Sequence, residues 1–175
     1  MKKLTIILFL AITSLALAGV VSAKPNKNLN APVVQENRFF SHKEAGVQFE
    51  LPKGWKAKPD GEVITVSTAD DSVQMVFWVP DEDTFDAAVK DLDTELGKTV
   101  KNIKITDKGT SNTHNGMAHF SEGGTGTVDG TTIEWSVDVL AAKKVVIILT
   151  FAAPGVAEKH ADEAVQFITS IKKIQ

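Results

Sequence analysis

Apolar and polar positions alternate with a period of two along much of the chain, and this pattern predicts β-strands. Residues 47–51 and 131–140 alternate in this way, which predicts strands with one buried face and one face in contact with solvent. Residues 72–79 and 145–152 are apolar at nearly every position, which predicts strands covered on both faces. Three shorter segments also have the composition of strands: residues 62–68, 102–106 and 117–121.

Two segments repeat instead with the period of an α-helix. In the first, the apolar stripe consists of Phe85, Ala88, Val89, Leu92 and Leu96. Asp83 is predicted to cap this helix at its N-terminus, and Gly97 is predicted to end it. The second helix is predicted over residues 156–173, and its stripe consists of His160, Ala164, Phe167, Ile168 and Ile171.

The predicted order of elements is therefore βββ-α-ββββ-α. Hairpin connections between consecutive strands make neighbouring strands antiparallel. Two strands that are apolar on both faces, together with two amphipathic helices, predict cover on both sides of one sheet. The expected fold is α+β, with a mostly antiparallel sheet of about six or seven strands and helices packed on both faces.

Polar and glycine-rich stretches separate these elements. Residues 107–116 are predicted to form a polar loop, and Asp129-Gly130 is a strong hairpin-turn dipeptide. The stretch before it is rich in glycine at Gly123, Gly124 and Gly126. A phosphate-binding loop needs a helix after its glycines, whereas a strand is predicted here. We therefore expect a hairpin over residues 123–130.

The N-terminal stretch has the order of a secretory signal peptide. Lys2 and Lys3 precede an almost entirely apolar run over residues 4–18, and small residues follow up to Ala23. We expect cleavage after Ala23, and a retained membrane anchor is the open alternative because the apolar run approaches the length of a span. The expected organisation is a signal peptide at residues 1–23, a flexible arm at 24–45 and one domain at 46–175.

Composition narrows the localisation and the chemistry. The 175 residues include no cysteine, which excludes disulfides, thiolate metal sites, thiol catalysis and acylation as a lipoprotein. We therefore expect a periplasmic or secreted protein without stable membrane insertion. A net charge of −3 and a single arginine, Arg38, argue against nucleic acid as a partner.

The residues capable of catalysis do not converge in the sequence. Ser121 lies in a segment that matches half of a nucleophile elbow, but His119 replaces the first glycine and no helix follows. His114 and His119 are five positions apart, so on one strand they would face opposite sides. His160 and Glu163 are one helical turn apart, at the edge of an apolar stripe. None of these pairs predicts a metal site.

Acidic and aromatic residues also have simple structural interpretations. The acids of the first helix resemble the opening of a calcium loop at Asp91, Asp93 and Glu95. The glycine comes one place too late and no closing glutamate follows, so we interpret them as a solvated helix face. Trp78 and Trp135 are predicted to lie in the core, and Trp55 is predicted to be partly exposed in a turn.

The segment Phe49-Glu50-Leu51-Pro52-Lys53-Gly54-Trp55 resembles the F-x-x-P-x-x-W start of the PsbP-like fold. That fold includes the photosystem subunit PsbP, the Mog-type Ran-binding proteins and bacterial DcrB-like envelope proteins. The exported context and the element order look most like the DcrB-like group, over residues 46–175. The resemblance implies a protein that binds partner proteins and has no shared active site. The chain departs from the DcrB-like pattern in lacking the cysteine that typically carries a lipid anchor.

We therefore expect an exported, non-enzymatic accessory protein that acts through protein–protein contacts in the cell envelope. No catalytic, cofactor-binding or metal-binding residue is assigned, no cofactor is expected, and the partner is an unidentified envelope protein. The predicted partner or ligand surface consists of Trp55, His114, His119 and Glu122. Two alternatives stay open: a periplasmic protein that binds a small ligand or a metal ion, and an envelope hydrolase.

Overall fold

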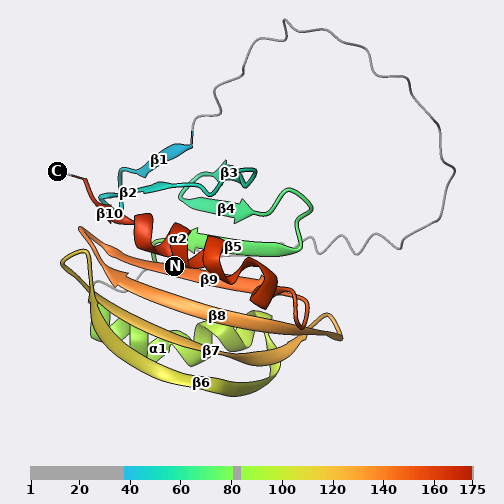
Figure 1. The fold of residues 1–175 in the computed structure, drawn as a ribbon. Helices are drawn as coiled ribbons and strands as arrows, with labels where there is room; N and C mark the ends of the chain where they lie inside the picture. Colours follow the sequence, from blue (N-terminus) through green and yellow to red (C-terminus); the bar gives the residue numbers. More distant parts are fainter. Residues whose placement is uncertain (1–37, 81–83, 175) are drawn as a thin grey trace, which may run out of the picture. The chain divides into compact units, whose positions relative to one another are not determined.

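The computed structural model describes residues 38–80 and 84–174 (Figure 1). The predicted signal peptide, residues 24–37 of the predicted arm and the predicted cap Asp83 lie outside the described residues. The elements follow one another as β1 (Phe39–His42), β2 (Val47–Glu50), β3 (Lys56–Asp60), β4 (Val63–Ser67), β5 (Val73–Trp78), α1 (Phe85–Thr99), β6 (Lys101–His114), β7 (Met117–Val128), β8 (Thr131–Ala141), β9 (Val145–Ala152), the 3₁₀ turn η1 (Ala157–His160), α2 (Ala161–Ser170) and β10 (Lys172–Lys173).

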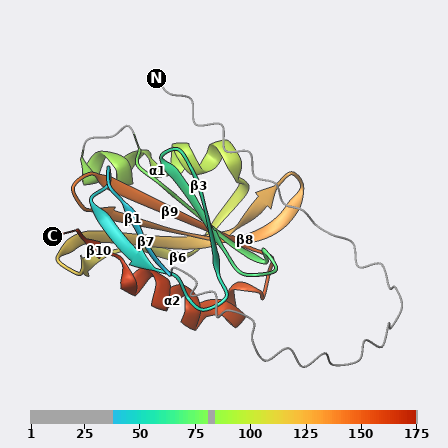
Figure 2. The ribbon, with the colours of Figure 1, turned by 90° about the horizontal axis from the view of Figure 1, so that it is seen from above.

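The strands form two sheets in place of the single sheet that the sequence predicts (Figures 1 and 2). The larger sheet has the order β3-β4-β5-β9-β8-β7-β6, and the smaller has the order β1-β2-β10. Every pair of neighbouring strands is antiparallel, so the α+β class and the mostly antiparallel pairing are confirmed. The chain leaves the smaller sheet at the turn after β2, where Gly54 has a φ of 82° and the Trp55 N–H donates to the Pro52 carbonyl at 3.2 Å.

The sequence does not predict three of the strands, because each of them is short and lacks a sustained apolar alternation. Strand β1 lies inside the predicted flexible arm, where Phe40 stacks on Phe49 of β2 at 5.9 Å between ring centroids. Strand β3 is an edge strand that contains Pro59, and β10 has only two residues. Strand β10 pairs with β2 from the other end of the domain (Lys172 with Gln48), and local periodicity does not report such a tertiary pairing.

The main core lies where α2 and the smaller sheet meet the larger sheet. The edge of the Phe167 ring on α2 packs against Phe49 of β2 at 5.3 Å between centroids, and Phe77 of β5 lies 5.5 Å from Phe49. All three rings are at most 2% exposed. Strand β9 is buried at every residue, as its unbroken apolar run predicts.

Helix α1 buries its predicted apolar stripe against the larger sheet. Ala88, Leu92 and Leu96 are its buried residues, and the helix contacts β6, β7 and β8. Helix α2 contacts β2 of the smaller sheet. Cover of opposite faces by the two helices stays a prediction.

Both helices begin or end away from their predicted boundaries. Thr84 caps α1, because its side-chain oxygen accepts a hydrogen bond from the Ala87 N–H at 3.3 Å. The helix continues through Gly97 to Thr99, so Gly97 does not end it. The last predicted helix starts as the 3₁₀ turn η1, becomes α-helical only at Ala161 and ends at Ser170.

The predicted loop at residues 107–116 and the predicted hairpin at 123–130 are largely strand. Strands β6 and β7 run the length of these segments and turn at Asn115 and Gly116, whose φ angles are 46° and 74°. The dipeptide Asn-Gly favours such a two-residue turn, so the signal was present in the sequence. The hairpin turn at Asp129-Gly130 is confirmed, but the glycines before it belong to β7.

These glycines allow the backbones of β6 and β7 to approach closely. The register between the two strands shifts at three places along β6. A Cβ atom on Gly124 would lie 2.2 Å from the carbonyl oxygen of Lys104, and one on Gly126 would lie 2.9 Å from that of Lys101. The absence of a side chain therefore serves strand packing at β-bulges.

Candidate functional site

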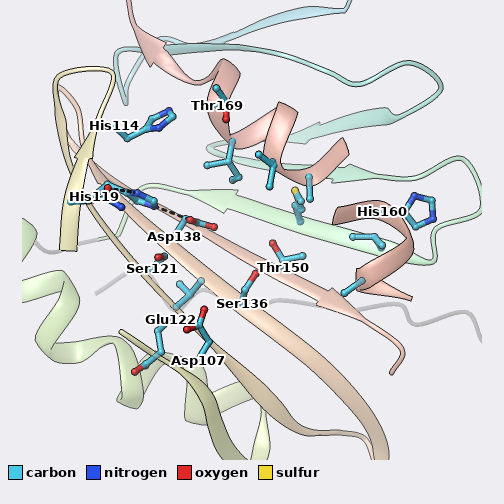
Figure 3. A pocket seen from close by; sticks show the side chains of 18 of the residues that line it. Asp107, His114, His119, Ser121, Glu122, Ser136, Asp138, Thr150, His160 and Thr169 are labelled. Carbon is cyan, nitrogen blue, oxygen red and sulfur yellow. Dashed lines mark hydrogen bonds and ion pairs between the residues drawn. The ribbon is translucent and has the colours of Figure 1, made fainter. Parts of the chain in front are cut away.

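A pocket of about 590 Å³ lies between α2 with η1 and the strands β6 to β9 (Figure 3). Its floor is polar and comes from alternating positions of neighbouring strands. Ser121 of β7 is paired with Asp138 of β8, and Ser136 of β8 is paired with Thr150 of β9. Since side chains two apart on a strand share a face, these four lie together on one side of the larger sheet.

The opposite wall of the pocket is apolar and comes from α2. Ala164, Val165 and Ile168 line it, and Val165 is 64% exposed. A large β-branched side chain in that position loses contact with water when a ligand covers it. The pocket therefore pairs an apolar wall with a hydrogen-bonding floor, which is the combination typical of ligand sites.

His119 occupies one end of the floor and has both ring nitrogens engaged. Its Nε2 donates to Oδ1 of Asp138 at 2.8 Å, and its Nδ1 lies 2.9 Å from the side-chain amide oxygen of Asn112. The side chains of His119 and Asp138 are only 10% and 14% exposed. The imidazole is thus held in one orientation between two strands and a carboxylate.

His114 and His119 come together in a way that their sequence spacing does not predict. They lie on opposite sides of the β6–β7 turn, and their ring centroids are 5.8 Å apart. His114 Nε2 is 3.2 Å from the Ile171 carbonyl, and the neighbouring Asn115 amide donates to the carbonyls of Thr169 and Ile171 at 3.0 and 2.7 Å. The tip of the hairpin therefore binds the C-terminal end of α2, where carbonyl groups lack helical partners.

The other end of the pocket carries the carboxylate of Asp107 on β6 (Figure 3). Glu122 of β7 also lines the pocket, but its side chain belongs to the other face of the larger sheet, because it directly follows Ser121 and pairs with the buried Val137. Asp107 is exposed and Glu122 is half-buried. Within the described part of the chain, the Asp107 carboxylate has no hydrogen bond or ion pair. This end of the pocket therefore offers negative charge to a bound group.

Trp55 does not form part of an exposed surface, so that prediction is wrong. The side chain is 7% exposed and packs edge-on against the His160 ring at 6.4 Å between centroids. His160 Nδ1 lies 2.6 Å from Oε2 of Glu163, and this hydrogen bond, followed by one from Trp55, lowers the pKa of Glu163. The segment Gly54-Trp55 thus anchors the start of α2. Trp78 and Trp135 are buried as predicted.

The described residues contain no group of three His, Asp or Glu side chains that could hold a metal ion. Four polar residues of the site were not singled out from the sequence: Asn112, Ser136, Asp138 and Thr150. The alternation of residues 131–140 marked the polar face of β8, but it did not distinguish solvent from a pocket.

Comparison with known proteins supports the fold alone. No family model and no curated protein matches the sequence. The structure is similar to that of cyanobacterial PsbP (CyanoP) from Synechocystis sp. PCC 6803, with a TM-score of 0.56 and 11% identity, over 77% of this chain and 91% of that one. It is also similar to LpqN of Mycobacterium tuberculosis, with a TM-score of 0.52 and 12% identity, over 72% and 82% of the two chains.

A protein from Bacteroides thetaiotaomicron has a TM-score of 0.55 at 12% identity, over 79% of this chain and 48% of that one. Within the described residues, neither helix is long and apolar enough to cross a bilayer. The strand order, the two sheets and these three similarities together show that the chain has a PsbP-like fold.

Proposed function

We propose that this protein is a non-enzymatic accessory protein of the cell envelope, and that it binds a segment of a partner protein in the pocket beneath α2. The observation that carries the proposal is the open pocket of about 590 Å³ with an apolar wall at one side and, at one end, the Asp107 carboxylate, which has no ion pair with any described residue. CyanoP is a PsbP protein and LpqN is described as involved in cell envelope biogenesis. The similarity to LpqN is compatible with an envelope setting.

The proposed setting follows the interpretation of the N-terminus. Residues 1–23 serve as a cleaved signal peptide, and the mature protein is periplasmic or secreted, like DcrB-like exported proteins but without their lipid. We also infer that α1 and α2 cover opposite faces of the larger sheet. On that arrangement, the α2 side alone carries the polar floor, while the α1 side is filled by Trp135 and its apolar neighbours.

The lining of the pocket indicates the chemistry of the partner segment. A lysine or arginine side chain would place its charge next to Asp107, whose carboxylate has no hydrogen bond or ion pair among the described residues. An apolar side chain next to it would cover Val165 and Ile168 on α2. The hydroxyls of the floor can hydrogen-bond an extended backbone.

The geometry of His119 supports the absence of catalysis. A serine nucleophile needs a histidine nitrogen that is free to take its proton. Both nitrogens of His119 are already hydrogen-bonded, and the Ser121 hydroxyl shares a hydrogen bond with Thr110 Oγ1 at 3.4 Å. This arrangement holds the imidazole in place and does not activate Ser121.

A second candidate function is the binding of a small organic ligand in the same pocket. Its volume falls within the range of about 300 to 1,000 Å³ that is common for small-molecule sites. A thermal-shift panel of metabolites with the purified protein tests this candidate, because a ligand that binds the folded state raises the melting temperature, and the increase grows with the logarithm of its concentration relative to Kd.

Photo-crosslinking in intact cells tests the main proposal. A photoreactive residue replaces Val165 on the wall of the pocket, and a matched one replaces Thr94, which is exposed on α1. We expect a discrete cross-linked product from position 165 alone. With purified components, Asp107→Asn should weaken binding of that partner about tenfold or more, since a hydrogen bond to a charged group contributes about 1.5 kcal/mol or more. Glu122→Gln is the matched control and should leave binding unchanged, because that side chain is on the other face of the sheet.

Two results would overturn the proposal. One is equal cross-linking from both positions, or none from position 165. The other is turnover of any substrate by the purified protein that disappears in Ser121→Ala, which would identify a hydrolase.

A further inference from the structure

A second pocket lies on a different part of the molecule, and we propose that it binds the phosphate group of an anionic ligand. This pocket also has a volume of about 590 Å³, and three lysines line it: Lys43, Lys143 and Lys173. They come from the β1–β2 turn, the β8–β9 turn and β10, which are far apart in the sequence. The site is independent of the pocket beneath α2.

Main-chain hydrogen bonds hold the three segments together. The Lys143 N–H donates to the Ala45 carbonyl at 3.1 Å, and the Ile174 N–H donates to the Gly46 carbonyl at 2.9 Å. Lys173 pairs with Val47 in the smaller sheet. The backbone positions of the three lysines are therefore determined by the fold, and only their side chains have to adjust to a ligand.

The lining of this pocket is positively charged without a compensating acid. It contains three lysines and neither aspartate nor glutamate. The nearby Glu44 is already bound by Lys144, and this hydrogen bond lowers the pKa of Glu44. Such a concentration of positive charge in a chain with a net charge of −3 attracts anions.

Gly46 keeps this pocket in its observed form. Its φ is 69°, and a Cβ atom there would lie 2.6 Å from the Cβ of Lys143. A larger residue at this position would displace the stem of Lys143. The turn that carries Lys43 can thus lie against Lys143 only because residue 46 is a glycine.

The residue types indicate a phosphate ester. Lysine is a compact point charge with three donors, which suits the several oxygens of a phosphate group. Ala142 and Ile174 lie beside the lysines and can contact an organic portion of the ligand. A free phosphate compound and an anionic lipid headgroup share this chemistry, and the experiment distinguishes the two sources.

Binding to two probes tests the proposal: inorganic pyrophosphate by calorimetry, and phosphatidylcholine vesicles with or without phosphatidylglycerol by co-sedimentation. We expect Lys143→Ala and Lys173→Ala each to weaken binding about five- to tenfold, since each removes a charge-assisted hydrogen bond. Lys90→Ala on α1 is the control, since Lys90 is exposed and outside the pocket. Melting temperatures of all variants should match that of the wild type.

Pyrophosphate binding with this lysine dependence supports the proposal and a free phosphate ligand. Binding only to vesicles that contain phosphatidylglycerol, with the same dependence, supports it with a lipid headgroup as the source. Binding to neither probe would overturn the proposal. So would an equal loss of binding in Lys90→Ala, because the interaction would then be non-specific.

Discussion

Replacement of Gly124 by alanine tests whether the glycine-rich stretch is a packed strand, as the structure has it, or a loop. The added Cβ would lie 2.2 Å from the Lys104 carbonyl oxygen and 2.9 Å from Cζ2 of Trp135. The first of these atoms is backbone and the second belongs to a side chain that is 3% exposed. Neither can move aside without shifting β6 or the core beneath it.

The expected loss of stability follows from two opposing contributions. Overpacking of a buried site costs about 1 to 3 kcal/mol, and contact with backbone atoms favours the upper end of that range. Alanine also restricts the unfolded chain relative to glycine, which offsets about 0.5 to 1 kcal/mol. The net free energy of unfolding should fall by about 2 kcal/mol, which lowers the melting temperature by roughly 6 °C.

The assay is urea unfolding followed by circular dichroism, with Gly97→Ala as the matched control. Gly97 lies within α1 and has nothing within 4 Å of the added Cβ, so the same substitution should stabilise the protein by about 0.5 to 1 kcal/mol. Opposite signs for the two variants are the predicted outcome. A Gly124→Ala variant as stable as the wild type would refute the reasoning, because a residue in a loop tolerates the change.

Three further predictions concern the turns and the pocket. Hydrogen bonds from the Thr68 hydroxyl and from Ser72 lower the pKa of Asp70 to about 2, so its contribution to stability is complete above about pH 4 and is lost as the pH falls towards 2. Acid unfolding of Asp70→Asn should therefore depend less on pH in that interval. Asn115→Ala should destabilise the protein by about 1 to 2 kcal/mol in urea, since it removes the cap on α2 and places alanine at a φ of 46°. A double-mutant cycle of His119→Gln and Asp138→Asn should give a coupling energy of about 1 to 2 kcal/mol, since the pair is largely buried.

Each of these predictions has an outcome that contradicts it. Parallel pH profiles of wild type and Asp70→Asn would show that the carboxylate is not selectively stabilised in the folded state. Glycine adopts a positive φ without strain. If Asn115→Gly lost as much stability as Asn115→Ala, backbone strain would contribute nothing, and the lost hydrogen bonds alone would explain the effect. A coupling energy near zero would mean that His119 and Asp138 do not interact in solution.

Much of the fold could be predicted from the pattern of apolar residues. The buried strands β5 and β9, the alternating strand β8 and the apolar stripe of α1 all reflect local periodicity, which the packing then uses. Boundaries were less predictable. Gly97 does not end α1, and the polar residues 107–116 are strand, because edge strands expose their side chains and need no apolar alternation.

The candidate site was predicted only in part. Glu122, His114 and His119 line the pocket, whereas Trp55 is buried behind His160. The two histidines meet because β6 and β7 fold back at Asn115-Gly116, which no spacing rule for a single strand anticipates. Asp138 and Thr150 join the site through strand pairing alone.

By itself, the sequence determined the class of the fold, the position of the buried strands and the exclusion of cysteine chemistry, because these depend on composition and on short-range periodicity. The tertiary structure decided which polar residues face a pocket and which face water, since both have the same alternation along a strand. It also decided where charges meet. Lys43, Lys143 and Lys173 come from three separate segments of the sequence. Only the register of β10 on β2 and the hydrogen bonds of the β8–β9 turn bring these segments together.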